Sequence, residues 1–275
     1  MTATDDTRIR IGRSFHRHAG GYDRFSVVQK RVVSRLERLV AAHLTQAPRQ
    51  VLDIGCGTGA MLAALAGRYP RAALCGLDLA FNMARHAELR LGGQGLFVNG
   101  DAERLPFRDA SFDLVVSTST FQWLDRMDAG FAECLRVLRR DGLLCIAFFG
   151  GRTLWELQTC YREAVTNRFG ATDSRQGRMQ RFRDRGEVER VLERLGCEQM
   201  LVAQETEMDD HPDVADLLRS IKSIGAATAG RSDGVGGLGW RGLLADMADI
   251  YRARFGNNGR IPATYEVIYV VARKR

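Results

Sequence analysis

The sequence lacks any apolar run that approaches the roughly 18 residues of a membrane span. Its N-terminal stretch, with Asp5, Asp6, Arg8 and Arg10, has no signal-peptide core. The six cysteines are scattered with no Cys-x-x-Cys pair, and the five histidines show no metal-ligand spacing. These absences argue against a membrane span, export and a metal site. We expect a cytoplasmic protein whose cysteines are buried free thiols.

Lysine is also scarce, because only Lys30, Lys222 and Lys274 are present and the net charge of +7 comes almost wholly from arginine. A basic surface attracts acidic partners, which include nucleic acid, anionic membrane and acidic carrier proteins. The charge is spread along the chain without a basic tail or an interleaved aromatic platform. Nucleic acid is therefore the weaker choice of partner.

The length of 275 residues and the hydrophobic content of 45% fit one elaborated α/β domain or two small ones. Apolar runs alternate with helical patterns, which predicts a mostly parallel sheet with helices on both faces. A helix with Val28, Val32, Leu36 and Leu39 on one side precedes the first strand and should cover the edge of a cofactor site. The predicted strands are 50–54, 73–77, 95–98, 112–117, 143–149, about 200–207 and 264–273.

The most informative segment is Val51–Gly59, an apolar run that ends in the turn Gly55-Cys56-Gly57-Thr58-Gly59 before a helical pattern. Glycines allow a tight turn and a close approach to a ligand, and a carboxylate about 20 residues farther on, here Asp78, can hold two ribose hydroxyls. The spacing is Gly-x-Gly-x-Gly, and Asp53 would repel a pyrophosphate in this turn. The ligand should therefore carry a positive group, as the sulfonium of S-adenosylmethionine does.

Four further segments follow in order, Gly100–Phe107, Ser111–Ser117, Leu135–Leu138 and Asp141–Leu144. With the glycine-rich turn they resemble the class I methyltransferases that use S-adenosylmethionine, over roughly residues 50–149. The resemblance implies a Rossmann-like fold with a seven-stranded, mostly parallel sheet. It implies that Asp78 binds the ribose hydroxyls, that Asp101 and Ala102 meet the adenine amino group, and that an apolar Met83 lies under the adenine. The expected cofactor-binding residues are Gln29, Asp53, Gly55, Gly57, Gly59, Asp78, Leu79, Met83, Asp101, Ala102 and Ser117.

Segments outside this core resemble the BioC family, the malonyl-acyl-carrier-protein O-methyltransferases of biotin synthesis, over nearly the whole chain. The resemblance implies methylation of the free carboxylate of a malonyl thioester, with acyl carrier protein as partner and no metal. It places Tyr22 and Gln29 at the cofactor entrance and Phe121 to Trp123 at the reaction chamber, so Tyr22, Gln122 and Trp123 are the catalytic candidates. The segments that carry it are 15–23 with 27–29, 120–124, 149–157, 217–226 and 261–267.

The expected organisation follows from both resemblances. Residues 1–48 form a helical cap of the cofactor site, 49–150 form the core that binds S-adenosylmethionine, and 151–275 form a helical substrate lid with the last strands. The predicted helices of this last part are 153–168, 184–195, 213–225 and 240–254. The glycine-rich segment 230–239 is expected to be a mobile loop between lid helices.

The acceptor chemistry constrains the substrate side. A carboxylate with a reference pKa of about 4 is already ionised at neutral pH, so transfer to it needs no general base. It does need a cation to orient it, and arginine suits carboxylates well. Arg181 and Lys222 are, with Phe121, the candidates for substrate binding. Arg152 and Arg162 are the second choices. Each of these cations could also be a plain surface charge.

Three alternatives remain open at this point. The segments 149–157 and 262–265 also resemble complex I assembly factors, which modify a protein arginine. A methyltransferase of the menaquinone type would act on a quinone-like small molecule, but it would not need the long lid. A binding module that had lost its cofactor is the third, and the intact Asp53, Asp78 and Asp101 with the glycines of the turn argue against it.

Overall fold

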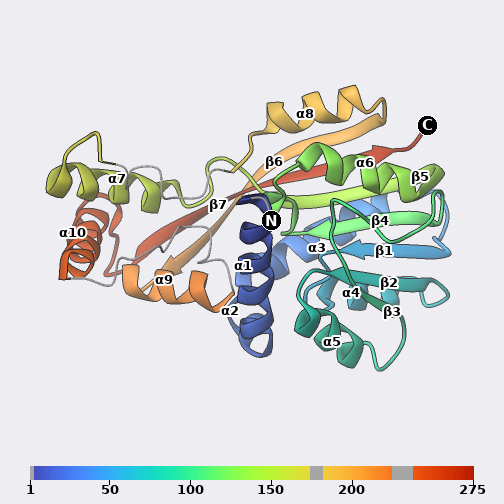
Figure 1. The fold of residues 1–275 in the computed structure, drawn as a ribbon, viewed down its shortest axis with the longest axis horizontal. Helices are drawn as coiled ribbons and strands as arrows, with labels where there is room; N and C mark the ends of the chain where they lie inside the picture. Colours follow the sequence, from blue (N-terminus) through green and yellow to red (C-terminus); the bar gives the residue numbers. More distant parts are fainter. Residues whose placement is uncertain (1–2, 174–181, 225–237) are drawn as a thin grey trace.

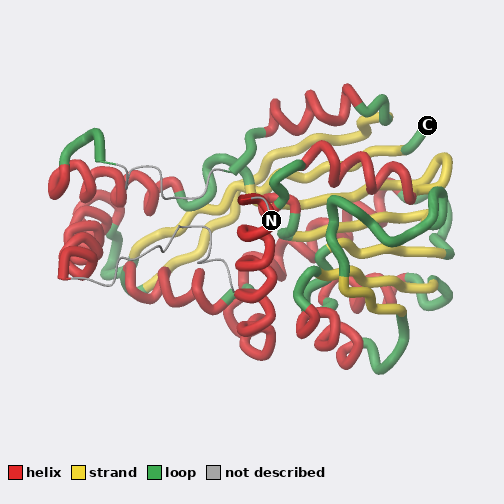
Figure 2. The backbone as a smooth tube through the Cα atoms, viewed as in Figure 1, coloured by secondary structure: helices red, strands yellow, loops and turns green. Residues whose placement is uncertain are grey.

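The computed structural model describes residues 3–173, 182–224 and 238–275. Its centre is one seven-stranded sheet in the order β3-β2-β1-β4-β5-β7-β6. The first five strands of this order run parallel, whereas β7 is antiparallel to both of its neighbours. The predicted mostly parallel, seven-stranded sheet is therefore confirmed (Figure 2). The strands are β1 (Gln50–Ile54), β2 (Ala73–Asp78), β3 (Leu96–Asn99), β4 (Phe112–Thr118), β5 (Leu138–Phe149), β6 (Glu198–His211) and β7 (Ile261–Arg273).

Helices connect the strands, and none of the described helices is long and apolar enough to cross a membrane. The four helices predicted after residue 150 are all present as α7 to α10. The α-helices are α1 (Ala3–His18), α2 (Tyr22–Phe25), α3 (Val27–His43), α4 (Ala60–Arg68), α5 (Phe81–Arg90), α6 (Met127–Val137), α7 (Trp155–Phe169), α8 (Arg185–Arg194), α9 (Val214–Ser223) and α10 (Leu238–Phe255), with the 3-10 helices η1 (Ala19–Gly21) and η2 (Phe121–Trp123).

The sheet is covered on both faces, as its apolar strands require. Successive side chains of a strand point to opposite faces, so Val51 and Leu52 of β1 enter two different hydrophobic clusters. The cluster of Val51 includes buried residues of α3 and α4, and that of Leu52 includes buried residues of α6 and α8. Five of the six cysteines are buried and all six are free thiols, as predicted.

The helix predicted from Val28, Val32, Leu36 and Leu39 forms as α3, and its buried side packs on the sheet. It does not supply the residues that border the ligand cavity described below. That position is taken by α1 and α2, which precede it in the chain. The predicted helix therefore forms as α3, but the position expected for it at the edge of the site belongs to α1 and α2.

The antiparallel pair of β6 and β7, called the hairpin below although α9 and α10 lie between its strands in the chain, extends beyond the rest of the sheet. β5 ends at the pair Phe149–Val267, so residues 261–266 of β7 pair with β6 alone. Figure 1 shows α7, α9 and α10 gathered around the far end of this hairpin. In contrast, α8 packs its buried residues against the sheet, so it is not part of a lid as its position in the sequence had suggested. Most of the predicted loop 230–239 lies outside the described residues.

The base of the hairpin is fastened to α7 by a buried polar joint. Glu156 is 2% exposed, and its carboxylate accepts hydrogen bonds from the backbone N–H and the hydroxyl of Thr264. The Thr153 hydroxyl donates to the carbonyl of Glu266 over 3.0 Å, and the N–H of Leu154 donates to the carbonyl of Thr264 over 2.6 Å. The segments 149–157 and 261–267 thus form one structural unit.

Candidate active site

A cavity lies where the parallel strands end, which is where open α/β sheets bind ligands. The chain leaves β1 for β2 on one side and later returns to β4 on the other, so the strand order reverses at this point. The space measures about 770 Å³ including its open mouth, which suits a small molecule. Its lining residues are Ile11, Phe15, Tyr22, Gly55, Gly57, Leu77, Asp78, Leu79, Met83, Gly100, Asp101, Ala102, Glu103, Thr118, Ser119, Thr120, Trp123 and Leu124.

Asp78 ends β2 at the floor of the cavity. One carboxylate oxygen accepts the N–H of Gly57 over 2.9 Å, and the other accepts the N–H of Ala80 over 2.8 Å. Burial raises the pKa of Asp78 to about 6, although these two N–H groups oppose the shift. Each oxygen keeps lone-pair capacity for a ligand, so Asp78 can accept two hydroxyl groups in fixed directions.

Asp53 lies directly behind the glycine-rich turn and is 1% exposed. Neither of its carboxylate oxygens has a hydrogen-bond partner within the described ranges. Burial, and then the charge of Asp78, raise the pKa of Asp53 well above its usual range. A buried carboxyl group without a partner is costly to a folded protein. The cost is offset if a ligand brings a positive charge or N–H donors to this place.

The glycine-rich turn brings backbone close to the cavity. Gly55 has a φ of +67°, and a Cβ atom there would lie 2.0 Å from the Thr120 hydroxyl oxygen. Gly57 has a φ of +52° and no atom within 4 Å of its missing Cβ, because that position faces open space. The turn therefore requires glycine for its conformation at both positions and leaves its backbone exposed to a ligand. Gly59 does not line the cavity but contacts α5 through Ala87.

One wall of the cavity is aromatic. Phe15 of α1 meets Trp123 edge-on, with ring centroids 5.7 Å apart. Tyr22 lies nearby with Phe15 around the buried Met83 and Ala80. Burial and the neighbouring carboxylates of Asp78 and Asp23 raise the pKa of Tyr22 above its usual range, so its hydroxyl keeps its proton at neutral pH.

Three predicted site residues lie behind this wall and do not line the cavity. Phe121 is 1% exposed and packs against Phe131 and Phe148 in the core. Gln122 donates from its side-chain amide to the Ser119 carbonyl over 2.8 Å. Ser117 donates to the Ile54 carbonyl over 2.7 Å, which ties β4 to β1.

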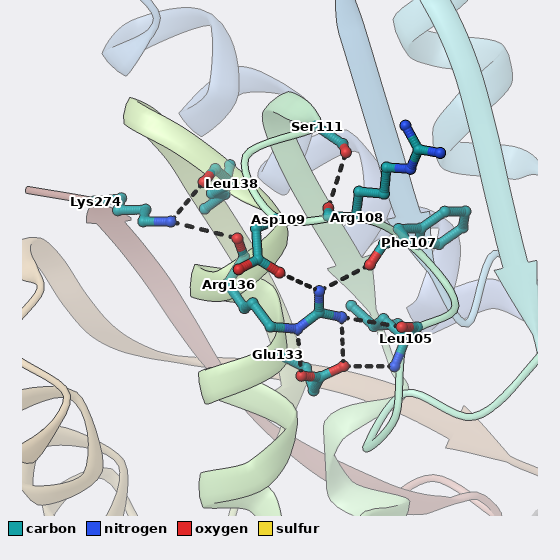
Figure 3. Close-up of polar contacts among 9 residues, drawn as sticks. All are labelled: Leu105, Phe107, Arg108, Asp109, Ser111, Glu133, Arg136, Leu138 and Lys274. Atoms are coloured by element: carbon teal, nitrogen blue, oxygen red, sulfur yellow. Dashed lines mark hydrogen bonds and ion pairs between the residues drawn. The ribbon is translucent and has the colours of Figure 1, made fainter.

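Arg136 and its hydrogen-bond partners hold the loop that follows Asp101 and Ala102 in the cavity lining. Figure 3 shows the Arg136 guanidinium held by both oxygens of Glu133 and by Asp109, with distances of 2.7 to 2.8 Å. The same group donates to the carbonyls of Leu105 and Phe107 over 3.0 and 2.8 Å. The three contacts with Leu105, Phe107 and Asp109 fix the loop that follows the predicted adenine-binding pair, and the planar fork of arginine suits this arrangement.

The sequence of this chain resembles those of known methyltransferases. Residues 52–146 match the model of the methyltransferase domain family. A malonyl-acyl-carrier-protein O-methyltransferase from Geobacter sulfurreducens is 45% identical, and the match covers 97% of this chain and 99% of that protein. The chain belongs to this enzyme family. A second member, from a Methylovorus species, is 38% identical over 95% of this chain and 87% of its own length.

Solved structures support the class I methyltransferase fold of this family. A putative methyltransferase from Bacillus halodurans has a TM-score of 0.61 with 19% identity, and the match covers 88% of this chain and 99% of that one. The YcgJ protein of Bacillus subtilis has a TM-score of 0.59 with 18% identity over 87% of this chain and 97% of that one. At these identities the likeness concerns the fold alone.

Members of the malonyl-acyl-carrier-protein O-methyltransferase family use S-adenosylmethionine, and the cavity fits it. Asp78 offers two acceptors for ribose hydroxyls, and the turn at Gly57 is open to the ligand. The unpartnered carboxyl group of Asp53 suits the cationic methionine portion. Asp101, Ala102 and Met83, the residues predicted to meet the adenine, all line the cavity.

Two further predicted residues, Gln29 and Lys222, lie outside the lining of the cavity. Gln29 is buried in α3, and Lys222 is exposed on α9. Arg181 lies outside the described residues. No lysine, arginine or histidine belongs to the described lining of the cavity. The roles predicted for Gln29, Gln122, Ser117, Phe121 and the two cations therefore stay predictions.

Sequence reasoning missed half of the lining, although two signals were present. Ile11 and Phe15 are four residues apart, the spacing of one helix face. The Thr118–Thr120 segment follows the fourth strand, whose carboxyl end had to meet the site. The lining residues not predicted are Ile11, Phe15, Leu77, Gly100, Glu103, Thr118, Ser119, Thr120 and Leu124.

Proposed function

We propose that this protein methylates the free carboxylate of a malonyl group carried by acyl carrier protein, as an early step of biotin synthesis in the cytoplasm. The match to the Geobacter sulfurreducens enzyme over nearly the whole of both chains carries this proposal. It extends through the hairpin and the helices α7, α9 and α10, which the methyltransferase domain alone does not include.

The residues that line the cavity, together with Asp53 behind the glycine-rich turn, divide into two groups by their proposed contacts. Asp53, Asp78, Asp101 and the turn at Gly57 would hold S-adenosylmethionine, which supplies a methyl group on a positively charged sulfur. Tyr22, Phe15 and Trp123 border the space left for the acceptor. Their rings exclude water, which would otherwise surround and stabilise the ionised acceptor.

The protonation states of nearby groups fit an acceptor that is already ionised. Burial raises the pKa of Cys56 well above its usual range, so this thiol is not an available base. Tyr22 also keeps its proton and can donate a hydrogen bond to the acceptor. A malonyl carboxylate needs no proton removed before it attacks the methyl group, so the chain has only to orient it.

The carboxylates around the cavity would repel a negative acceptor in the absence of the cofactor. Asp78, Asp101 and Glu103 all line the space. The positive charge of S-adenosylmethionine offsets this repulsion, so the acceptor should bind after the cofactor. Lys222 on the exposed side of α9 and Arg181 are the cations proposed to guide the malonyl carboxylate or its carrier.

A growth experiment tests the proposal in the cell. A bacterial strain that lacks its own malonyl methyltransferase requires biotin, and this chain should restore growth without it. The Asp78→Ala variant is the matched negative control because it removes the proposed ribose contact. Failure of the wild-type chain to restore growth, although it is expressed and binds S-adenosylmethionine, would point to a different acceptor.

A further inference from the structure

Asp23 joins three separate parts of the molecule. Its Oδ1 atom accepts a hydrogen bond from the Thr58 hydroxyl over 2.7 Å. Its other carboxylate oxygen forms an ion pair with Arg90 at the end of α5. Thr58 is 5% exposed and lies between Gly57 and Gly59 in the glycine-rich turn. Asp23 thereby links the N-terminal segment to the turn that borders the cofactor cavity and to α5.

The N-terminal segment 3–25, which comprises α1, η1 and α2 and is called the cap below, forms one side of the cavity. Ile11, Phe15 and Tyr22 of the cap line it. The cap also contacts the start of α5, where the Asn82 side-chain amide donates to the His16 carbonyl over 3.1 Å. A ligand in the cavity contacts this wall, so it should leave faster when the wall is held less firmly.

Asp23 follows Tyr22 directly in the chain, and both belong to the single turn of α2. A four-residue helix has little stability of its own, so its place depends on tertiary contacts. Thr58 is nearly inaccessible and belongs to a turn whose neighbouring glycines hold positive φ angles, so its hydroxyl has a fixed position. The bond from Thr58 to Asp23 therefore determines where Tyr22 stands over the cavity.

We propose that Asp23 is a positioning residue that holds Tyr22 and the cap closed over the bound cofactor and slows its exchange. The charge of Asp23 is shared between a buried hydroxyl and a half-exposed guanidinium. The bond from Thr58 fixes the position of Asp23, and the ion pair with Arg90 keeps the Asp23 carboxylate directed at the glycine-rich segment. This inference rests on the proposed function only in taking S-adenosylmethionine and its product S-adenosylhomocysteine as the ligands.

The test measures how fast S-adenosylhomocysteine leaves the full-length protein, by stopped-flow fluorescence. Thr58→Val removes the hydroxyl at nearly constant volume, and Asp23→Asn removes the charge. Each should speed dissociation about tenfold, as expected for the loss of one charge-assisted hydrogen bond. The double variant should be less than a hundredfold faster than the wild type, because both changes weaken the bond between Thr58 and Asp23 and their effects are not additive.

Two further variants separate positioning from general stability. Thr58→Ser keeps a hydroxyl and should restore slow dissociation. Arg185→Gln removes a surface arginine that pairs with Glu189 on α8, far from the cavity in the fold, and should leave dissociation unchanged. Tm is measured for every variant without ligand.

Dissociation rates within about twofold of the wild type for both Thr58→Val and Asp23→Asn would overturn the proposal, whatever happens to Tm. The readout needs no methyl acceptor, so it remains valid if malonyl carrier protein proves to be the wrong substrate. Conversely, methyl transfer to malonyl carrier protein with unchanged dissociation in these variants would leave the proposed function intact and reject the role of Asp23.

Discussion

Asp53 is a buried side chain whose placement makes sense only with a ligand. Its two unpartnered oxygens should destabilise the protein when no cofactor is bound. We predict that Asp53→Asn raises the Tm of the cofactor-free protein by about 2–4 °C, the shift expected for roughly 1 kcal/mol. The same change should weaken binding of S-adenosylmethionine at least tenfold, because the charge that faces its cation is lost. Calorimetry measures both quantities.

Asp113 provides the matched control, since it is a strand carboxylate of the same sheet with a full set of partners. It accepts from the N–H groups of Arg49 and Gln50 and pairs with Arg139. Arg139 and these N–H groups lower its pKa, so Asp113→Asn should lower Tm at neutral pH. A lower Tm for Asp53→Asn with unchanged cofactor affinity would contradict the role given to Asp53.

Asp78 makes cofactor binding dependent on pH. Its pKa of about 6 in the cofactor-free protein means that it takes up a proton as the pH falls through this value. The protonated group is a poorer acceptor for ribose hydroxyls, so affinity for S-adenosylmethionine should fall up to about tenfold for each pH unit below 6. Titration calorimetry between pH 5 and 8 would contradict this if the affinity were constant.

Protonation of Asp78 should stabilise the cofactor-free protein, although it weakens cofactor binding. Its pKa in the folded state lies above that of an unfolded chain, about 4, so the ionised form disfavours folding. This cost is present above pH 6 and is relieved between about pH 6 and 4, where only the folded state holds the proton. Within that window, Asp78→Asn should lessen the pH dependence of Tm.

The cofactor residues near the glycine-rich turn could be predicted because they are close in sequence to the strand ends that carry them. Asp78 and Asp101 both follow apolar strands, and the parallel order brings such ends together. Phe15 could not be predicted in the same way, since its place depends on how the cap packs on α5 after the chain folds. Gln122 was a candidate from its segment, but the sequence gives no sign that its amide bonds the backbone at Ser119.

Among helices and strands, the joint between α7 and β7 determines where the hairpin leaves the sheet. The Glu156 carboxylate lies in the first turn of α7 and bonds the Thr264 hydroxyl. We predict that Thr264→Val costs about 1 kcal/mol of stability and that Glu156→Ala costs about 1.5–3 kcal/mol. Denaturant unfolding measures both, and a double variant should lose less than the sum. Equal stability of all variants would show that the joint does not hold the hairpin.

Element boundaries departed from prediction where strands carry polar residues. β5 begins at Leu138, five positions before its predicted start, because Leu138 pairs with Phe112 across an irregular step. The segment from Arg139 to Gly142, between Leu138 and the predicted start of the strand at residue 143, has the sequence of a turn. β6 continues to His211 through Asp209 and Asp210, which pair with β7 beyond the end of β5, and the apolar pattern of β6 gives no signal there. The predicted lid included α8 because its sequence does not show which part of the sheet it covers.

The protein as a whole carries a net charge of +7 and its proposed partner is acidic. Long-range attraction of this kind is screened by salt, with a Debye length of about 10 Å at 0.1 M. We predict that KM for malonyl-acyl carrier protein rises several-fold between low and physiological ionic strength. The matched control is a malonyl thioester of pantetheine without protein, whose KM should change much less. An equal salt response for both acceptors would argue against a basic docking surface.

The most direct measurement incubates the purified protein with methyl-labelled S-adenosylmethionine and malonyl-acyl carrier protein, and follows the carrier by mass spectrometry. The account predicts one added methyl group that mild base removes, as an ester requires, and no label on acetyl-acyl carrier protein, which has no free carboxylate. The absence of label on the malonyl carrier, with cofactor binding demonstrated in the same sample, would contradict the proposed function.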